Sequence, residues 1–561
     1  MLTQKQLGFR RSDASPPNIT LYSSTSRDWE KIRYDLLALL PSQSTLERLG
    51  EANSCWWLVR AQCFKDYEKS LLSSSRVALS DFHPAMTAKA LLWVAICLQQ
   101  LPRGFDVDSL ELGCSPNGLI AKCINIVAMS ISSDETLIMN IDGLECLVLQ
   151  GIFYNNDGKL RSAWLSYRRA LNVAQIIGLH RLAPEAAQDS ESTSRARHIW
   201  NHIIYADRYL SLMLGMYHGI TDVALDSQCG LSEKPNTSMD LLCCIAGSII
   251  ERNQRLTQVT PAMVRITQTI DSELLSIDTP PLAGDSTIST SGKSVERAQS
   301  YNELMTQLWH YQLLAWLHLP LLLESGAQRR YDYSRQSCLE ASRHMITCYI
   351  SIRQLTADSF CCKSLDFQAF TAAVTLMINL LGPKGRPRSS SDDWLAVEGV
   401  MAILEKLAEG QPPDKVATRG LVVLQTLKDV ARGNKPTQIG APEGLSTDDK
   451  EPGRIKIDIP YFGTISLVCR MRSDPSEQQE PDNVPPHPLL FDTGIAVNTA
   501  PSSQMGIIPE LSTTQVQFTD IVHWPETRLE IGPNDIWTFG TGLAASPPFL
   551  PDFGDDWDLG F

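Results

Sequence analysis

Apolar residues recur at intervals of three and four positions through most of residues 28–432. This period places them on one face of an α-helix, and it returns in segment after segment. Alternation typical of strands occurs at 454–472, where Pro460 argues against a central strand. We therefore predict an all-α fold, a multi-helix array of antiparallel hairpins followed by one or two strands. The predicted helices cover residues 28–40, 84–101, 117–131, 135–154, 158–178, 194–216, 236–272, 297–324, 329–356, 365–381, 393–408 and 414–432.

Composition divides the chain into four regions. Residues 1–23 are polar and are predicted to be disordered, and residues 24–432 form the helical domain. Residues 433–473 are a linker that contains the strands, and 474–561 form an acidic, disordered tail rich in Pro, Ser and Thr. Two loops rich in Gly, Pro and Ser interrupt the helical domain, at 278–294 and 381–393.

The charge of the chain is concentrated in the tail. From Asp474 onward there are fourteen acidic residues and one basic residue, Arg528, which gives a net charge of −13. The preceding 473 residues carry 48 basic and 49 acidic groups and are nearly neutral. Such a tail repels phosphate backbones and suits partners with basic or apolar grooves.

Several classes of protein are disfavoured by what the sequence lacks. No two of the fourteen cysteines are separated by two residues, which argues against zinc ribbons and thioredoxin-like motifs and favours reduced, intracellular thiols. No apolar run is long enough to span a membrane. His198 and His202 lie four residues apart, but a third metal ligand is not evident, so we predict no metal site. No catalytic or phosphate-binding motif is present, and we predict neither an enzyme nor a cofactor.

Residues 135–181 have the spacing of a helical hairpin. Small and aromatic residues alternate across a turn at 155–159, in which Gly158 can adopt a positive φ. The pattern does not recur about 34 residues away, so it predicts one hairpin rather than a repeat array. The residues that carry this spacing are Gly151, Tyr154, Ala163, Tyr167 and Ala170.

The second helix of this hairpin ends in Gly178, His180 and Arg181. Gly178 is predicted to be a close contact or the C-cap, and the two cations suit the negative end of the helix dipole. In the next helix, Asp207 lies on the same stripe as Trp200 and other apolar residues. A partly buried carboxylate needs a partner, so we predict that Arg181 or Arg208 pairs with Asp207; the alternative is a solvated Asp207 at the edge of the stripe.

These same residues resemble the fungus-specific transcription factor domain, the helical middle region of fungal zinc-cluster regulators. The resemblance covers roughly residues 80 to 380 and includes the helix "AKALLWVAICLQQLP" at 88–102. It implies a transcriptional regulator of a metabolic or secondary-metabolite gene cluster, located in the nucleus. The matching positions are Ala163, Trp164, Gly178, Leu179, His180, Arg181, Arg195, Arg197, Trp200, Asp207, Arg208 and Ser211 to Gly215.

The chain departs from this family in one respect. Such regulators begin with a six-cysteine zinc cluster, whereas the first cysteine here is Cys55, in a helix-like segment. Either the protein acts through a DNA-binding partner, or a cysteine-rich exon precedes Met1. Formation of a homo- or heterodimer is also left open.

Two further segments are candidate contacts. "PKGRPRSS" at 383–390 is similar to an AT-hook core, in which Lys384, Arg386 and Arg388 would enter a minor groove; a basic interhelical loop or a nuclear-import signal is the alternative. The chain ends in "PFLPDFGDDWDLGF", where aspartates keep aromatic side chains solvated for a partner's groove, as in an acidic activation segment. Its aromatic residues are Phe549, Phe553, Trp557 and Phe561.

We therefore predict a fungal transcriptional regulator or co-regulator whose tail recruits the transcription machinery or coactivators. The alternative is a helical scaffold or adaptor that binds partner proteins without a role on DNA. An activation test of the tail separates the two.

Overall fold

The structure is a computed structural model of the 561-residue chain. The parts that it describes are residues 26–53, 83–102, 104–182, 191–220, 238–256, 259–277, 294–324, 329–356, 362–380, 391–409, 414–432, 445–447, 454–459 and 463–468. The predicted disordered ends at 1–23 and 474–561 lie outside these residues, as do the four tail aromatics and Lys384, Arg386 and Arg388.

The described chain is an array of α-helices, as predicted, followed by a small antiparallel sheet. Two of its strands lie in the predicted range 454–472, and the third, at 445–447, was not predicted. The helices in chain order are α1 (Ser26–Ala38), α2 (Gln43–Ala52), α6 (Pro84–Gln99), α7 (Pro116–Val127), α8 (Glu135–Ile138), α9 (Ile141–Asn156), α10 (Leu160–Ile176), α11 (Glu191–Met213), α13 (Ser238–Arg255), α14 (Pro261–Leu275), α15 (Ser294–Glu324), α16 (Asp332–Leu355), α17 (Lys363–Leu380), α18 (Ser391–Ala408) and α19 (Lys415–Arg432). Shorter turns are η1 (Val107–Leu110), the π-helical η2 (Ala128–Ser132), η3 (Leu179–Arg181) and η4 (Arg329–Tyr331). The strands are β1 (Leu445–Thr447), β2 (Arg454–Ile459) and β3 (Gly463–Val468), in the order β1-β2-β3.

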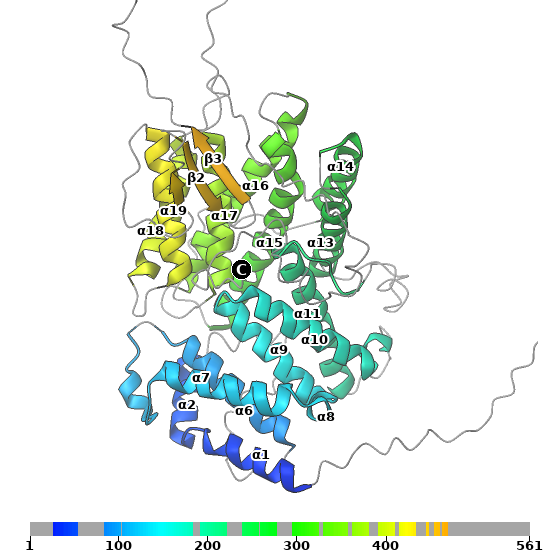
Figure 1. Ribbon diagram of the computed structural model, residues 1–561, viewed down its shortest axis with the longest axis vertical. Helices are drawn as coiled ribbons and strands as arrows, with labels where there is room; N and C mark the ends of the chain where they lie inside the picture. The colour runs from blue at the N-terminus through cyan, green and yellow to red at the C-terminus, as the bar shows by residue number, and fades with distance from the viewer. Residues whose placement is uncertain are drawn as a thin grey trace, which may run out of the picture.

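The helices follow one another along the length of the molecule (Figure 1). The N-terminal helices α1, α2, α6 and α7 lie at one end, α13–α19 lie toward the other, and α9, α10 and α11 lie between them. An ion pair joins the middle to the C-terminal helices, because Lys363 Nζ at the start of α17 lies 2.8 Å from Asp157 Oδ1 at the end of α9. The α9–α11 region is therefore the junction of the array.

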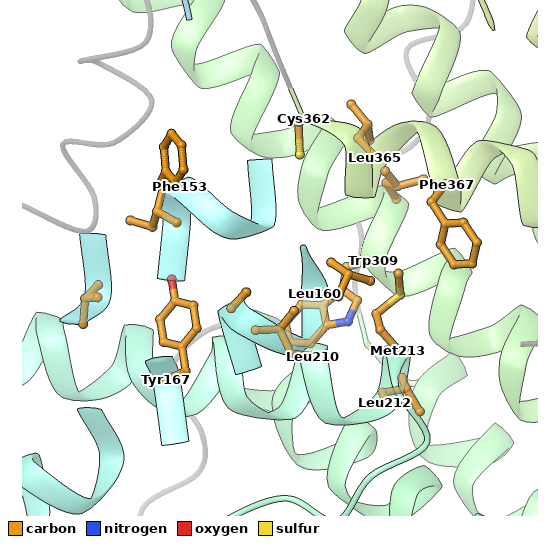
Figure 2. Packing of buried hydrophobic residues seen from close by; sticks show 14 of the residues in the cluster. Phe153, Leu160, Tyr167, Leu210, Leu212, Met213, Trp309, Cys362, Leu365 and Phe367 are labelled. Carbon is orange, nitrogen blue, oxygen red and sulfur yellow. The ribbon is translucent and has the colours of Figure 1, made fainter. Parts of the chain in front are cut away.

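One hydrophobic core runs through this junction. Figure 2 shows Phe153 of α9, Tyr167 of α10 and Met213 of α11 in the same cluster as Trp309 of α15 and Phe367 of α17. All five side chains are buried. Each described cysteine is a free thiol, and most are buried, as expected of reduced residues in a helical core.

Several elements differ from the sequence prediction. Helix α2 was not predicted, and the helix predicted at 135–154 is two helices, α8 and α9. The predicted helix at 236–272 is two helices, because Pro261 cannot continue α13 and instead opens α14 after the N-cap Thr260. The predicted loop at 381–393 ends early, because Ser391–Asp393 form the first turn of α18. Acidic side chains favour the positive end of the helix dipole, and buried Asp393 also accepts two hydrogen bonds from Arg343.

A buried histidine of α15 makes the stability of the fold depend on pH. Burial, and secondarily the charge of His344, lowers the pKa of His310 to about 4. An unfolded histidine titrates near pH 6.5, so between these values the unfolded chain binds more protons, and stability falls as the pH drops from about 6.5 toward 4.

Between pH 7 and pH 5 the free energy of unfolding falls, because His310 binds a proton more readily in the unfolded chain. We expect this fall to be smaller by about 2 kcal/mol in His310→Gln. The measurement is urea denaturation at both pH values, followed by circular dichroism. His180→Gln is the matched control, because His180 lies at a helix end outside the core cluster. An unchanged pH dependence in His310→Gln would refute the assignment.

Candidate functional site

The candidate site is the three-helix unit α9–α10–α11, which contains the family-like residues. Glycine sets its geometry: Gly158 has a φ of +80° in the α9–α10 turn, and Gly178 has a φ of +85° at the end of α10. The positive φ predicted for Gly158 is confirmed. Of the two alternatives for Gly178, the structure supports a helix-ending glycine, which follows the C-cap Ile177, and no atom lies close enough for a close contact. Ala163 and Ala170 are fully buried, which lets α10 approach its neighbours closely.

The closest approach in the unit is between Gly151 of α9 and the ring of Tyr167 of α10. A Cβ atom on Gly151 would lie 2.5 Å from Tyr167 Cε2, closer than side chains tolerate. The Tyr167 hydroxyl lies 3.0 Å from His202 Nε2 of α11, so this tyrosine contacts both neighbouring helices. Tyr167 is 3% exposed and has little room to move.

We expect Gly151→Ala to cost about 1–3 kcal/mol of unfolding free energy, because the added methyl group displaces the Tyr167 ring. Denaturant unfolding measures the effect. Gly399→Ala in α18 is the control, because its Cβ would meet only the terminal methyl group of Ile350, at 3.1 Å. Equal stabilities of the two variants would contradict the close packing at Gly151.

Asp207 of α11 has two partners. Its Oδ1 lies 2.8 Å from Arg168 Nε of α10, and its Oδ2 accepts a 2.7 Å hydrogen bond from the backbone amide of Gly219. Burial raises the pKa of Asp207, while the Arg168 charge and the Gly219 amide act in the opposite direction. We call Arg168, Asp207 and Gly219 the clasp, because they join α10, α11 and the segment after α11.

The other contacts of Arg168 fix its position. Its guanidinium carbon lies 4.7 Å from the centre of the Trp164 ring, and Nη2 donates to the carbonyl of Tyr217. Trp164 Nε1 in turn donates to Ser211 Oγ at 3.0 Å. Trp164, a family-like residue, thus contacts Arg168 of the clasp directly, and Ser211, another, holds the Trp164 ring in place.

The predicted partner of Asp207 was wrong. Arg208 is 1% exposed and donates to the carbonyl oxygens of Cys243 and Ile220, which ties α11 to α13. Arg181 is exposed, and its Nε donates to His180. The prediction of a buried, paired Asp207 is confirmed, but the cation is Arg168, because α10 turns that side chain toward α11.

The remaining family-like residues support the junction. Trp200 is 4% exposed, and its ring centre lies 6.4 Å from that of His180, so η3 packs against α11. The predicted apolar stripe of α11, which includes Trp200 and Asp207, is buried as expected.

A second charged cluster joins α6, α9 and α11, and the sequence prediction missed it. Lys89 Nζ lies 2.9 Å from Asp142 Oδ1 and 2.5 Å from Glu145 Oε2. Arg195, at the start of α11, contacts the same two carboxylates at 2.5–2.7 Å. Burial alone would raise the pKa of Asp142, but Lys89 and Arg195 hold it below its usual value. Two cations and two anions thus neutralise one another, and we call them the four-charge cluster.

The histidines considered as metal ligands have other contacts. His202 faces Tyr167, and His198 Nδ1 lies 2.6 Å from the carbonyl of Ser194. Within the described ranges, no group of three or more His, Cys, Asp or Glu side chains is placed to hold a metal ion. Of the helices described, none combines the length and the apolar character needed to cross a bilayer.

Known proteins similar to this chain are named as transcription factors or as regulators of biosynthesis. It is 28% identical over 559 residues to a dehydrocurvularin biosynthesis regulator of Alternaria cinerariae, covering 92% of this chain and 72% of that protein. It is 26% identical over 560 residues to the regulator of the same name from Aspergillus terreus, covering 93% and 74%. It is also 30% identical over 393 residues to the transcription factor sdnS of Sordaria araneosa, covering 66% and 50%.

The chain is similar to fungal transcription regulators. The names of these relatives describe regulators rather than enzymes. A scan against models of known protein families gives no match.

Proposed function

We propose that this protein regulates transcription in the fungal nucleus and controls a biosynthetic gene cluster. The observation that carries the proposal is similarity along more than nine-tenths of the chain to two regulators of dehydrocurvularin biosynthesis.

The helical body supplies rigidity in this proposal. The charged groups of the clasp and of the four-charge cluster bind neighbouring helices to one another. The body therefore serves as a frame that binds partners, and the acidic-aromatic segment 548–561 recruits the transcription machinery.

Access to DNA is proposed to come from a partner protein. The fourteen cysteines lack the two-residue spacing of a zinc cluster, and the near-neutral body gives little general attraction to phosphate. Lys384, Arg386 and Arg388 are proposed as an auxiliary DNA or nuclear-import contact.

The test of recruitment is a fusion of residues 540–561 to an unrelated DNA-binding domain, with reporter transcription as the readout. We expect activation, and we expect its loss when Phe549, Phe553, Trp557 and Phe561 are all replaced by Ala. A version that replaces the four aspartates of 548–561 by Asn separates the role of charge from that of the aromatic rings. A silent fusion would favour the scaffold alternative.

The test of DNA access is chromatin mapping of the full chain with and without candidate zinc-cluster partners. Occupancy that disappears with one partner supports indirect binding. Occupancy that is unchanged without any of them, and lost in Lys384→Ala/Arg386→Ala/Arg388→Ala, would show direct contact instead.

A further inference from the structure

The side of α10 opposite its buried residues carries a stripe of exposed and half-buried side chains, which borders Arg168 of the clasp. At 3.6 residues per turn, its five residues fall within an arc of about 80° and extend for about 22 Å. Leu165 is 61% exposed and Ile176 is 68% exposed. The residues of this outer stripe are Arg161, Leu165, Arg169, Asn172 and Ile176.

The stripe faces away from the neighbours of α10. The opposite side of the helix contains its buried residues, which pack against α9 and α11: Leu160, Ala163, Tyr167, Ala170, Leu171, Val173 and Ala174. Leu165 and Ile176 are the two large aliphatic side chains that this face of α10 leaves in solvent.

The charge of the stripe is positive. Helix α10 contains three arginines and no acidic residue. Arg168 is paired with Asp207, whereas Arg161 and Arg169 make no ion pair with any residue in the described part of the chain. The stripe therefore offers two unneutralised guanidinium groups, that of Arg161 one turn before Leu165 and that of Arg169 between Leu165 and Ile176.

The segment 548–561 has the complementary pattern. Its four aspartates alternate with Phe549, Phe553, Trp557 and Phe561, so that it carries negative charge and apolar rings in one short run. Because residues 1–473 are almost neutral overall, attraction to this segment has to come from a local basic site. Residues 469–547 separate it from β3, a contour of about 260 Å, so distance does not limit contact.

We propose that the outer stripe of α10 is the docking surface for the chain's own segment 548–561. Aspartates of the segment pair with Arg161 and Arg169, and its aromatic rings cover Leu165 and Ile176. Docking removes from solvent the rings that recruit the transcription machinery, so this inference rests on the proposed function. Exposed ion pairs are weak and are screened by salt, which makes the contact reversible.

The test uses the full chain with the photo-reactive residue p-benzoylphenylalanine in place of Phe553. After irradiation, we expect cross-linked peptides from residues 160–177, and fewer of them as salt is raised. Mixing isotopically labelled and unlabelled chains shows whether each cross-link lies within one chain. Cross-links mainly to other helices, or mainly between chains, would overturn the proposal.

Charge reversal makes the test specific. We expect Arg161→Glu/Arg169→Glu to reduce the α10 cross-link at least fivefold, and Asp555→Lys/Asp556→Lys/Asp558→Lys in the segment to restore it.

Lys122→Glu/Arg265→Glu is the matched control, since both side chains are exposed on other helices. Circular dichroism checks folding, and Leu165→Ser, which leaves the charges intact, is a second variant expected to weaken the cross-link. An unchanged yield in the arginine variant, or no rescue by the lysines, would contradict the pairing.

A reporter assay separates this proposal from the proposed function. Arg161→Glu/Arg169→Glu is expected to raise transcription several-fold in the 561-residue chain at equal protein level. The 540–561 fusion lacks the helical body, so its activity is independent of docking. Activation by the fusion without α10 cross-links would leave the regulator function standing and refute docking.

Discussion

Glu145→Gln is expected to lower the free energy of unfolding by about 3–5 kcal/mol. The change removes one of two carboxylates from the four-charge cluster and leaves two cations, Lys89 and Arg195, beside Asp142. Lys89 is 1% exposed, so water cannot replace the lost charge. Denaturant unfolding followed by circular dichroism measures the loss.

The control is the double variant Lys89→Met/Glu145→Gln. It removes one cation and one anion together, so that Arg195 and Asp142 remain as a neutral pair. Exchanging a buried ion pair for groups of similar volume is often nearly neutral, and the double variant should therefore be more stable than Glu145→Gln alone. Strictly additive losses would show that the charges do not interact.

Asp207→Ala is expected to cost about 2–3 kcal/mol. The substitution leaves Arg168, which is only 22% exposed, without its anion and the Gly219 amide without its acceptor. Asp207→Asn keeps an acceptor but loses the charge, so it should retain part of this stability. The measurement is the unfolding free energy at neutral pH.

Arg181→Ala is the matched control for the clasp. Arg181 was the sequence-based candidate, yet it is exposed and contacts His180, so its removal should change stability by less than about 0.5 kcal/mol. A large loss in Arg181→Ala, or none in Asp207→Ala, would contradict the observed pairing.

The fold was largely predictable from the sequence because most of it depends on local pattern. The spacing of Gly151, Ala163 and Tyr167 specifies a hairpin without reference to the rest of the chain, and Gly178 marks the end of its second helix. Two of the misplaced boundaries concern residues with two structural uses: Pro261 suits the first turn of a helix as well as a break in one, and Asp393 suits a loop as well as a first helical turn.

The charged contacts were less predictable because they depend on how helices are rotated against one another. The burial of Asp207 follows from its place on an apolar stripe, but the choice between Arg168, Arg181 and Arg208 does not. One signal existed: Arg168 is one turn after Trp164 and faces α11 with it.

Lys89 offered a similar signal. It is the single charged residue of α6, in a run from Pro84 to Leu98 that is buried throughout. A lysine in such a run requires an anion, but Glu145 lies 56 positions away, beyond the reach of any local spacing rule.

The clasp also determines how much positive charge α10 shows to its surroundings. Arg168 lies at the border between the buried side of the helix and the outer stripe, and Asp207 cancels its charge. One of the two contacts of that carboxylate is with a main-chain amide, that of Gly219. The Gly219 amide binds one oxygen of Asp207 while the other faces Arg168, so the segment after α11 helps to keep this carboxylate beside the third guanidinium of α10. The path of the backbone after α11 thus helps to determine where Asp207 lies. Through Asp207 it also determines how much of the positive charge of Arg168 is neutralised at the surface of α10.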